Sequence, residues 1–330
     1  MTVMLLLGDC RATLKTMRDK SVHCCVTSPP YFGLRDYQVK EQIGLEPTPD
    51  EFVAAMVEVF REVKRVLRDD GTLWLNLGDS YGSSGGDIFT GFNARYHGSV
   101  SQGDKQSAIA ENAKSAGNSR KYSGSLRPKN LLGIPWRVAF ALQADGWYLR
   151  QDIIWHKPNP MPESVRDRCT KSHEYIFMLS KSPRYYFDSE AIREEAKPES
   201  AKRYAAGYKN FAKGQFYGSP VDKRAPKEKT ADQLSGLNGR NRRSVWTVST
   251  KPFKGAHFAT FPPDLIEPCV LAGAPVGGVV LDPFGGAGTT GLVAQRNGRN
   301  SVLCELNYEY VGIACERLGD VFGWLPECME

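Results

Sequence analysis

The sequence lacks the features that would anchor the chain in a membrane or build it around disulfides or zinc. No apolar run approaches the roughly 20 residues that a membrane helix needs. Residues 1–9 are mostly apolar, but they have no basic leader and end at Asp9, so they predict a strand rather than a signal peptide. The 8 cysteines form no Cys-x-x-Cys pair and no cluster with histidine at zinc spacing. We therefore expect a cytoplasmic protein with buried, unpaired cysteines and no metal.

The charge of the chain is unevenly distributed. Of 330 residues, 41% are hydrophobic and 24% are charged, which is typical of one large globular α/β domain with an insertion. Residues 193–251 contain 14 Lys and Arg against 6 Asp and Glu, a net charge of +8, whereas the remainder has a net charge of −2. A local basic excess indicates a polyanionic partner, although a solvated basic loop would have the same composition.

Strand-like apolar runs alternate with helical periodicity along most of the chain. The predicted strands are residues 4–7, 22–26, 72–77, 148–155, 174–179, 278–281 and 301–305. The predicted helices are residues 14–18, 49–69, 134–143, 263–271, 289–296 and 308–318. This alternation predicts an α/β fold with a doubly wound, mostly parallel sheet. Residues 82–129, rich in Gly, Ser and Asn, interrupt the pattern as a loop insertion.

A glycine turn after one predicted strand is a candidate cofactor loop. The strand ends at Asp282, and the turn opens the helix that begins at Thr289. Gly286 and Gly288 would let the backbone approach a ligand, whose polar end could be held by helix N–H groups and the hydroxyl of Thr290. The turn also fits the spacing Gly-x-Gly-x-x-Gly, so a dinucleotide site remains an alternative here.

Glu305 ends the next predicted strand. A carboxylate in this position can accept hydrogen bonds from two ribose hydroxyls. This property suits any adenosine cofactor, NAD and S-adenosyl-L-methionine alike.

The run Thr27–Ser28–Pro29–Pro30–Tyr31 follows an apolar strand and favours one chemistry. An amine attached to an aromatic ring is a poor nucleophile because its lone pair is delocalised. The Ser28 oxygen can accept one amine N–H and the Pro29 carbonyl the other, which favours a pyramidal nitrogen. Tyr31 offers a stacking face for the base. The prolines fix these acceptors before the substrate arrives, as electrostatic preorganisation requires.

These residues, in this order, resemble the amino-DNA-methyltransferases of the beta arrangement, in which the catalytic block precedes the cofactor block. The resemblance extends over nearly the whole chain. The blocks that carry it are residues 7–9, 27–31, 75–79, 153–160, 172–175, 257–262, 282–290 and 305.

The resemblance implies a class I methyltransferase fold, S-adenosyl-L-methionine as methyl donor and a base flipped out of double-stranded DNA as acceptor. It implies that Asp9 contacts the cofactor adenine, Glu305 the ribose and Asp282 the methionine amino group. The implied catalytic residues are Ser28, Pro29, Pro30 and Tyr31. The other implied cofactor residues are Thr27, Phe258, Phe284, Gly286, Gly288, Thr289 and Thr290.

The identity of the methylated base depends on opposing similarities. Many adenine enzymes of the family have Asp where this chain has Ser28, and Ser is frequent in the cytosine-N4 enzymes. The longer run from Thr27 to Tyr37, however, resembles solitary bacterial and phage enzymes that methylate adenine. Ser and Asp both accept an amine hydrogen bond, so this chemistry does not choose between the bases. On the longer run we expect N6-adenine, with N4-cytosine as the alternative.

The resemblance also divides the chain. It implies a catalytic half at residues 1–187, a target-recognition segment at 188–250 and a cofactor half at 251–330. The recognition segment holds the basic excess, so Arg240, Arg242 and Arg243 are expected to contact guanine edges or phosphates. A homodimer is a possible assembly. No nuclease block is visible in the sequence, so restriction of DNA would need a separate subunit.

Two other classes of function stay open. One is a nucleic-acid-binding protein with an inactive methyltransferase fold, and the other is methylation of RNA or of a protein glutamine. The intact Ser28, Asp282 and Glu305 argue against the first, and the basic segment favours DNA over the second.

Overall fold

The computed structural model describes residues 1–37, 39, 41–82, 128–195, 239–250, 260–319, 322, 328 and 329. Its contacts divide the chain into two units, Met1–Phe187 with Ser244–Glu330, and Asp188–Arg243. The first unit contains all the strands and helices named below. No helix in the described ranges is long and apolar enough to cross a bilayer.

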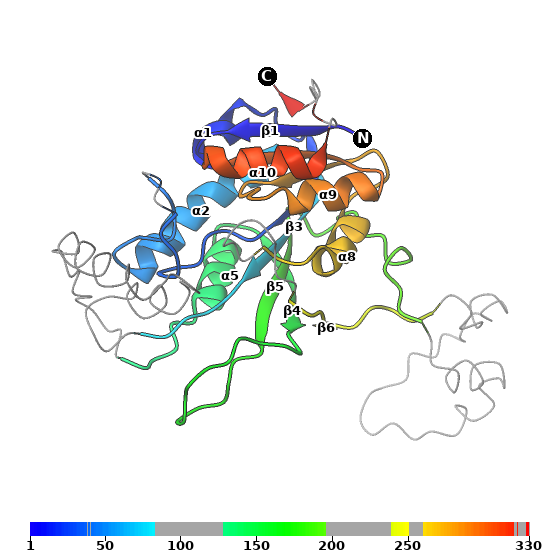
Figure 1. Ribbon diagram of the computed structural model, residues 1–330. Helices are drawn as coiled ribbons and strands as arrows, with labels where there is room; N and C mark the ends of the chain where they lie inside the picture. Colours follow the sequence, from blue (N-terminus) through cyan, green and yellow to red (C-terminus); the bar gives the residue numbers. More distant parts are fainter. Residues whose placement is uncertain are drawn as a thin grey trace, which may run out of the picture. The chain divides into compact units, whose positions relative to one another are not determined.

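The first unit is built on an eight-stranded sheet with the order β1-β8-β7-β2-β3-β5-β4-β6 (Figure 1). Five of its strand pairs are parallel, and only β5 runs antiparallel to its two neighbours. The predicted mostly parallel α/β sheet is therefore confirmed. The strands are β1 (Val3–Leu7), β2 (Val22–Thr27), β3 (Leu67–Leu77), β4 (Tyr148–His156), β5 (His173–Ser180), β6 (Val245–Thr247), β7 (Val279–Asp282) and β8 (Asn300–Glu305).

Helices cover both faces of this sheet, α1, α2 and α5 on one and α8, α9 and α10 on the other (Figure 1). The neighbouring residues Cys24 and Cys25 illustrate the two layers, because successive side chains of a strand point to opposite faces. Cys25 packs in the core beneath α2, whereas the Cys24 thiol faces the Cys269 carbonyl of α8. The helices are α1 (Cys10–Thr13), α2 (Pro49–Val66), α5 (Ile134–Ala144), α8 (Pro263–Gly273), α9 (Thr289–Arg296) and α10 (Tyr308–Leu318).

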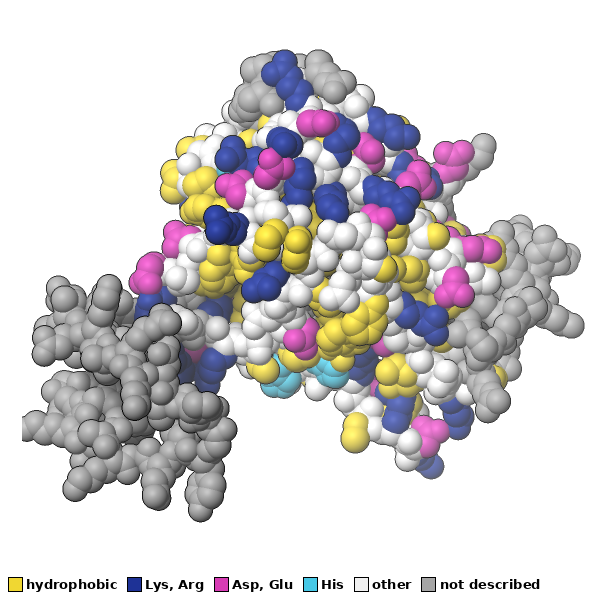
Figure 2. All heavy atoms as spheres, turned by 180° about the vertical axis from the view of Figure 1, so that it is seen from behind, with side chains coloured by type: hydrophobic (Ala, Val, Ile, Leu, Met, Phe, Trp, Pro, Cys, Tyr) yellow, Lys and Arg dark blue, Asp and Glu magenta, His cyan; other side chains and the backbone are white. Residues whose placement is uncertain are grey.

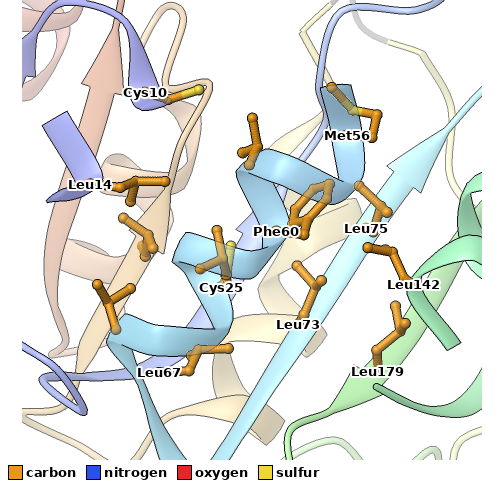
Figure 3. Packing of buried hydrophobic residues seen from close by; sticks show 14 of the residues in the cluster. Cys10, Leu14, Cys25, Met56, Phe60, Leu67, Leu73, Leu75, Leu142 and Leu179 are labelled. Carbon is orange, nitrogen blue, oxygen red and sulfur yellow. The ribbon is translucent and has the colours of Figure 1, made fainter. Parts of the chain in front are cut away.

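The largest core lies between α2, α5 and the sheet. Met56 and Phe60 of α2 are fully buried against Leu73 and Leu75 of β3 (Figure 3). The helix starts where its sequence predicts, because the Thr48 side chain accepts a hydrogen bond from the Glu51 amide at 3.2 Å. Each large apolar side chain buried in this way contributes about 1.5–3 kcal/mol to folding.

The structure departs from the predicted elements in three places. Helix α2 ends at Val66 rather than at residue 69, because the chain passes directly into β3, where Leu67 pairs with Val22. The helix expected at residues 14–18 is wrong: Asp9 caps a helix that begins at Cys10, and a short 3₁₀ turn follows. Strand β6 was not predicted, because its three residues are too few for a periodic pattern.

Of the cysteines, Cys169 and Cys315 are exposed and the other six are buried.

A tight contact between α8 and the sheet supplies the first prediction. A Cβ added at Gly273 would lie 2.4 Å from the Cys24 sulfur and 2.9 Å from Trp74 Nε1, both in the buried core. Gly273→Ala should lower the free energy of unfolding by about 1–3 kcal/mol, the usual cost of overpacking. Gly312→Ala, where an added Cβ meets nothing within 4 Å, is the control and should be neutral or raise stability by about 0.5–1 kcal/mol. Denaturant unfolding of both variants tests the contact, and equal stabilities would contradict it.

Candidate active site

Four strands bring the predicted site residues to one edge of the sheet. The parallel strands β1, β2, β7 and β8 end at or just before Asp9, Ser28, Asp282 and Glu305. The carboxyl ends of parallel strands meet at the same edge, where ligands of doubly wound sheets bind. These four residues line one pocket together with Phe284 of the glycine turn.

Asp282 connects the loop after β2, residues 27–31, to the glycine turn. This loop holds the residues that the resemblance implies to be catalytic and is called the catalytic loop below. Its buried carboxylate accepts hydrogen bonds from the Thr27 hydroxyl at 2.6 Å, the Thr290 hydroxyl at 2.6 Å and the Phe284 amide at 3.0 Å. Burial raises the pKa of Asp282, and these three donors oppose the rise. Thr27 and Thr290 therefore lie behind the pocket and hold the carboxylate that faces it.

Glu305 retains acceptor capacity toward the pocket. One carboxylate oxygen accepts from the Gly286 amide at 2.7 Å and the other from the Asn307 amide at 2.7 Å. The Leu306 amide also donates to this carboxylate, and a carboxylate can accept about four hydrogen bonds, so acceptor capacity remains. Burial raises the pKa of Glu305. A fixed, partly satisfied carboxylate of this kind can bind a pair of neighbouring hydroxyls.

The glycine turn needs its glycine at the start of α9. Gly288 has φ +75°, and a Cβ there would lie 2.9 Å from Leu318 of α10. The turn can therefore pack against α10 while the first amides of α9 remain at the pocket edge.

Asp9 also lines the pocket, but its carboxylate is paired. It accepts hydrogen bonds from the Arg11 backbone amide at 2.7 Å and from the Arg11 guanidinium. Burial alone would raise the pKa of Asp9, and the hydrogen bonds from Arg11 outweigh it, so the pKa is lowered. Asp9 thus faces the pocket as an ionised N-cap of α1.

Two tyrosines on the pocket wall were not predicted. The rings of Tyr37 and Tyr310 meet edge to face, with centroids 6.3 Å apart, and both side chains line the pocket beside Glu305. Tyr310 lies on the first turn of α10 and Tyr37 on the loop after β2. Tyr37 ends the run from Thr27 to Tyr37, but the sequence gives it no role there, and Tyr310 stands in no motif.

The catalytic loop after β2 divides between the pocket and the sheet. Ser28 and Pro30 line the pocket, whereas Pro29 and Tyr31 do not. The Tyr31 hydroxyl donates to Glu174 of β5 at 2.7 Å, and a Cβ on Gly78 would lie 2.6 Å from its ring. The Tyr31 ring packs over Gly78, the residue that follows β3, so a side chain at position 78 would collide with the ring.

This contact gives the second prediction. Gly78→Ala should push the Tyr31 ring aside and slow the methylation that the sequence resemblance implies, because the neighbouring Ser28 moves with the loop. A small misplacement of this kind can cost about 10²-fold in rate. Affinity for S-adenosyl-L-methionine should hold, because the Asp282 and Glu305 contacts do not involve Gly78. Single-turnover rates and calorimetry measure the two effects, and an unchanged rate in the alanine variant would contradict this role for Gly78.

The remaining predicted cofactor residues differ in where they lie relative to the pocket. Thr289 and Gly286 line it, but Gly288 does not, and Phe258 lies outside the described residues.

Among the residues that the structure describes, no group of three or more His, Cys, Asp or Glu side chains could hold a metal ion.

The three predicted DNA-binding arginines belong to the second unit. Arg240 and Arg243 both donate to the same Glu194 oxygen, at 3.0 and 3.1 Å. Burial would raise the pKa of Glu194, and the hydrogen bonds from these arginines lower it instead. Two of the three arginines are therefore ion-paired.

The fold and the pocket at the strand ends agree with the resemblance in the sequence. A comparison of the chain with protein-family models decides the family. Residues 22–316 match the N6/N4 DNA methylase family model. The chain belongs to the N6-adenine/N4-cytosine DNA methylase family. It is an S-adenosyl-L-methionine-dependent DNA methyltransferase.

Curated relatives of this DNA methylase cover almost its whole length. Type II methyltransferase M.Cfr9I of Citrobacter freundii is 47% identical over 311 residues, which are 94% of this chain and 86% of that protein. Type II methyltransferase M.SmaI of Serratia marcescens is 44% identical over 318 residues, 95% of this chain and 90% of that protein.

Solved structures show the same class I fold. PvuII DNA methyltransferase, described as cytosine-N4-specific, has a TM-score of 0.62 at 17% identity and covers 99% of this chain and 89% of that chain. A Thermus thermophilus protein, solved in complex with S-adenosyl-L-methionine, has a TM-score of 0.55 at 24% identity and covers 100% of this chain and 99% of that chain. At these identities the likeness concerns the fold.

Proposed function

We propose that this DNA methylase transfers a methyl group to the N4 amine of a cytosine flipped out of double-stranded DNA. The observation that carries the proposal is the position of Ser28, which lines the same pocket as Asp282 and Glu305. A hydrogen-bond acceptor for an amine is therefore next to the carboxylates that suit an adenosine cofactor.

The pocket residues fit S-adenosyl-L-methionine in our proposal. Glu305 would accept from the ribose hydroxyls with its remaining acceptor capacity, Asp282 would attract the methionine ammonium, and Asp9 would meet the adenine edge. The cofactor supplies an electrophilic sulfonium methyl group. Glu305 and Asp282 are both fixed by backbone amides, so they would need little reorganisation on binding.

In this proposal the catalytic loop acts on the amine by hydrogen bonding alone. The Ser28 oxygen accepts one N–H and the Pro29 carbonyl accepts the other, which holds the nitrogen pyramidal with its lone pair toward the methyl group. Pro29 is buried and Pro30 lies against Gly44, so the loop is rigid before the base enters. Tyr31 contributes through its hydroxyl contacts with the sheet.

The choice of cytosine depends on which loop residues can reach a base. The run after Tyr31, which favoured adenine, contains Phe32, whose ring is 1% exposed and packs on Phe52 with centroids 5.6 Å apart. Tyr37, in the same run, lines the pocket beside Tyr310 and Glu305, where the proposal places the ribose. The similarity of this run to adenine enzymes therefore concerns packing and the cofactor side of the pocket rather than base contact. Ser28, the residue frequent in cytosine-N4 enzymes, lines the pocket. N6-adenine remains the second candidate, because a serine hydroxyl accepts its amine equally well.

One experiment tests base and site together. DNA from cells that express the chain should contain N4-methylcytosine in a fixed sequence context, detected by mass spectrometry of nucleosides and by single-molecule sequencing. Cells that express Ser28→Ala provide the matched control. N6-methyladenine in the same experiment would overturn the choice of base, and unmodified DNA would overturn the proposed function.

Recognition of DNA by the second unit gives the third prediction. On the face shown in Figure 2, the Lys and Arg side chains of described residues are interspersed with Asp and Glu, without a single basic patch. If Arg240, Arg242 and Arg243 contact phosphates, replacing all three with alanine should weaken DNA binding and flatten its log–log salt dependence by about 0.9 per lost contact. If one of them contacts a guanine, discrimination at that base pair should fall by about 1–3 kcal/mol.

The control for this prediction changes Glu194, the ion-pair partner of Arg240 and Arg243, and leaves the arginines in place. Glu194→Gln lacks the charge that binds Arg240 and Arg243, so DNA affinity should hold or rise. Titrations against salt on cognate and scrambled duplexes measure all variants. Unchanged binding by the triple-alanine variant would move DNA recognition to another part of the chain.

A further inference from the structure

The catalytic loop is connected to the sheet by a chain of polar side chains from three distant segments. Tyr31 of the loop contacts Asn76 of β3 and Glu174 of β5, and Glu174 forms an ion pair with Lys157, just after β4. The side chains of Glu174 and Lys157 are only 15% and 18% exposed. The Lys157 ammonium also lies 4.2 Å from the centre of the Trp155 ring. A buried network of this kind has fixed partners.

The network determines which atom each hydroxyl proton faces. A carboxylate accepts and cannot donate, so the Tyr31 hydroxyl must donate its single proton toward Glu174, 2.7 Å away. Asn76 does not compete as a donor to Tyr31, because its amide nitrogen donates to the Tyr175 carbonyl at 3.0 Å and to Glu174 at 3.3 Å. Its carbonyl oxygen faces Tyr31 as a second acceptor at 3.2 Å.

The direction of the first hydrogen bond dictates the next one. Once its own proton points at Glu174, the Tyr31 oxygen can only accept from Ser28, whose hydroxyl lies 3.4 Å away. Burial and the nearby Glu174 raise the pKa of Tyr31, so Tyr31 keeps the proton that it donates. The Ser28 proton is then turned away from the pocket that Ser28 lines, and the lone pairs of its oxygen face the pocket.

We infer that Glu174 is a positioning residue that makes Ser28 a hydrogen-bond acceptor for the target amine. It acts through Tyr31: its charge sets the direction of the chain Ser28–Tyr31–Glu174, and Lys157 balances that charge. In its place, the amide nitrogen of a glutamine whose oxygen binds Lys157 would donate to the Tyr31 oxygen and occupy the lone pair that accepts from Ser28. The Ser28 hydroxyl could then rotate and present its proton to the amine, where it competes for the nitrogen lone pair. The inference rests on the proposed function, because it assigns a role toward the same amine.

A double-mutant cycle tests the inference with purified full-length protein, an oligonucleotide duplex and S-adenosyl-L-methionine. Glu174→Gln keeps the size of the side chain and removes its charge. It should lower the single-turnover rate about tenfold or more, with unchanged affinity for cofactor and DNA. In the Ser28→Ala background the same change should have no effect on the rate, because there is no hydroxyl to orient. Glu62→Gln, which removes one of the two acidic partners of Arg65 on α2, is the control for losing an ion pair and should keep the wild-type rate.

Each outcome decides one question. An equal rate loss in both backgrounds, with a lowered melting temperature, would mean that Glu174 supports the fold only and would overturn the inference. A Glu174→Gln rate equal to wild type would overturn it as well. If Glu174→Gln does not fold, Tyr31→Phe removes the same link without disturbing the Glu174–Lys157 pair and enters the same cycle. A wild-type protein that methylates no duplex would count against the proposed function and not against the chain of hydrogen bonds.

Discussion

Ser28→Ala is expected to lower the single-turnover rate of methylation by about 10²–10³-fold, the scale that follows loss of one preorganised transition-state hydrogen bond. Ser28 lines the pocket, and its hydroxyl donates to Tyr31 at 3.4 Å. The alanine variant keeps the Asp282 and Glu305 contacts, so its affinity for S-adenosyl-L-methionine should be that of wild type. A loss of rate without a loss of binding is the mark of an interaction made in the transition state.

The control is a serine outside the site. Ser21 donates to the Arg18 carbonyl at 2.8 Å on the surface, and Ser21→Ala should keep the wild-type rate. Rapid-quench methylation of a short duplex, with calorimetry for the cofactor, separates rate from affinity. A Ser28→Ala rate equal to wild type would remove Ser28 from the mechanism.

Asp282→Ala is expected to lose both cofactor affinity and stability. The change leaves the buried hydroxyl of Thr27 and the amide of Phe284 without their acceptor, and each unsatisfied group costs about 1–3 kcal/mol. It also removes the carboxylate proposed to attract the cofactor ammonium. The three hydrogen bonds of Asp282 therefore give it a role in the fold as well as in the pocket.

Asp282→Asn separates the two effects, because it removes the charge and keeps one oxygen to accept from Thr27 and Phe284. Its amide group can donate to the Thr290 hydroxyl, which can then donate to the Val26 carbonyl instead. Burial raises the pKa of Asp282, so the folded protein binds this proton more tightly than the unfolded chain. The stability contribution of the group is therefore present at low pH and is lost as the pH rises through the raised pKa. At neutral pH the asparagine variant should be at least as stable as wild type, and this difference should shrink as the pH falls.

Cofactor affinity in the asparagine variant should nevertheless drop, since the charge is what the ammonium would meet. Thermal unfolding between pH 4 and 8 and calorimetry at pH 7 check the two parts. Wild-type affinity in Asp282→Asn would show that the carboxylate serves the fold and not the cofactor.

The sequence by itself determined the α/β class and the edge of the sheet that carries the site. Helices α9 and α10 have the predicted bounds, because capping and apolar periodicity are local properties that a short window contains. Asp282 and Glu305 could be placed together because each ends a buried strand, and parallel strands have a common carboxyl edge. The motif around Ser28 could be placed at the same edge, since it follows the strand β2.

Only the tertiary structure decided how the site residues are held. Tyr31 and Glu174 are 143 residues apart, and they meet because β5 pairs antiparallel with β3, with Tyr175, the neighbour of Glu174, opposite Leu77. The pairing of Arg240 with Glu194, 46 residues away, likewise changes what that arginine has available for DNA. Such contacts depend on strand register and side-chain direction across the sheet, which arise from the packing of the whole chain and leave no periodic pattern in any one segment.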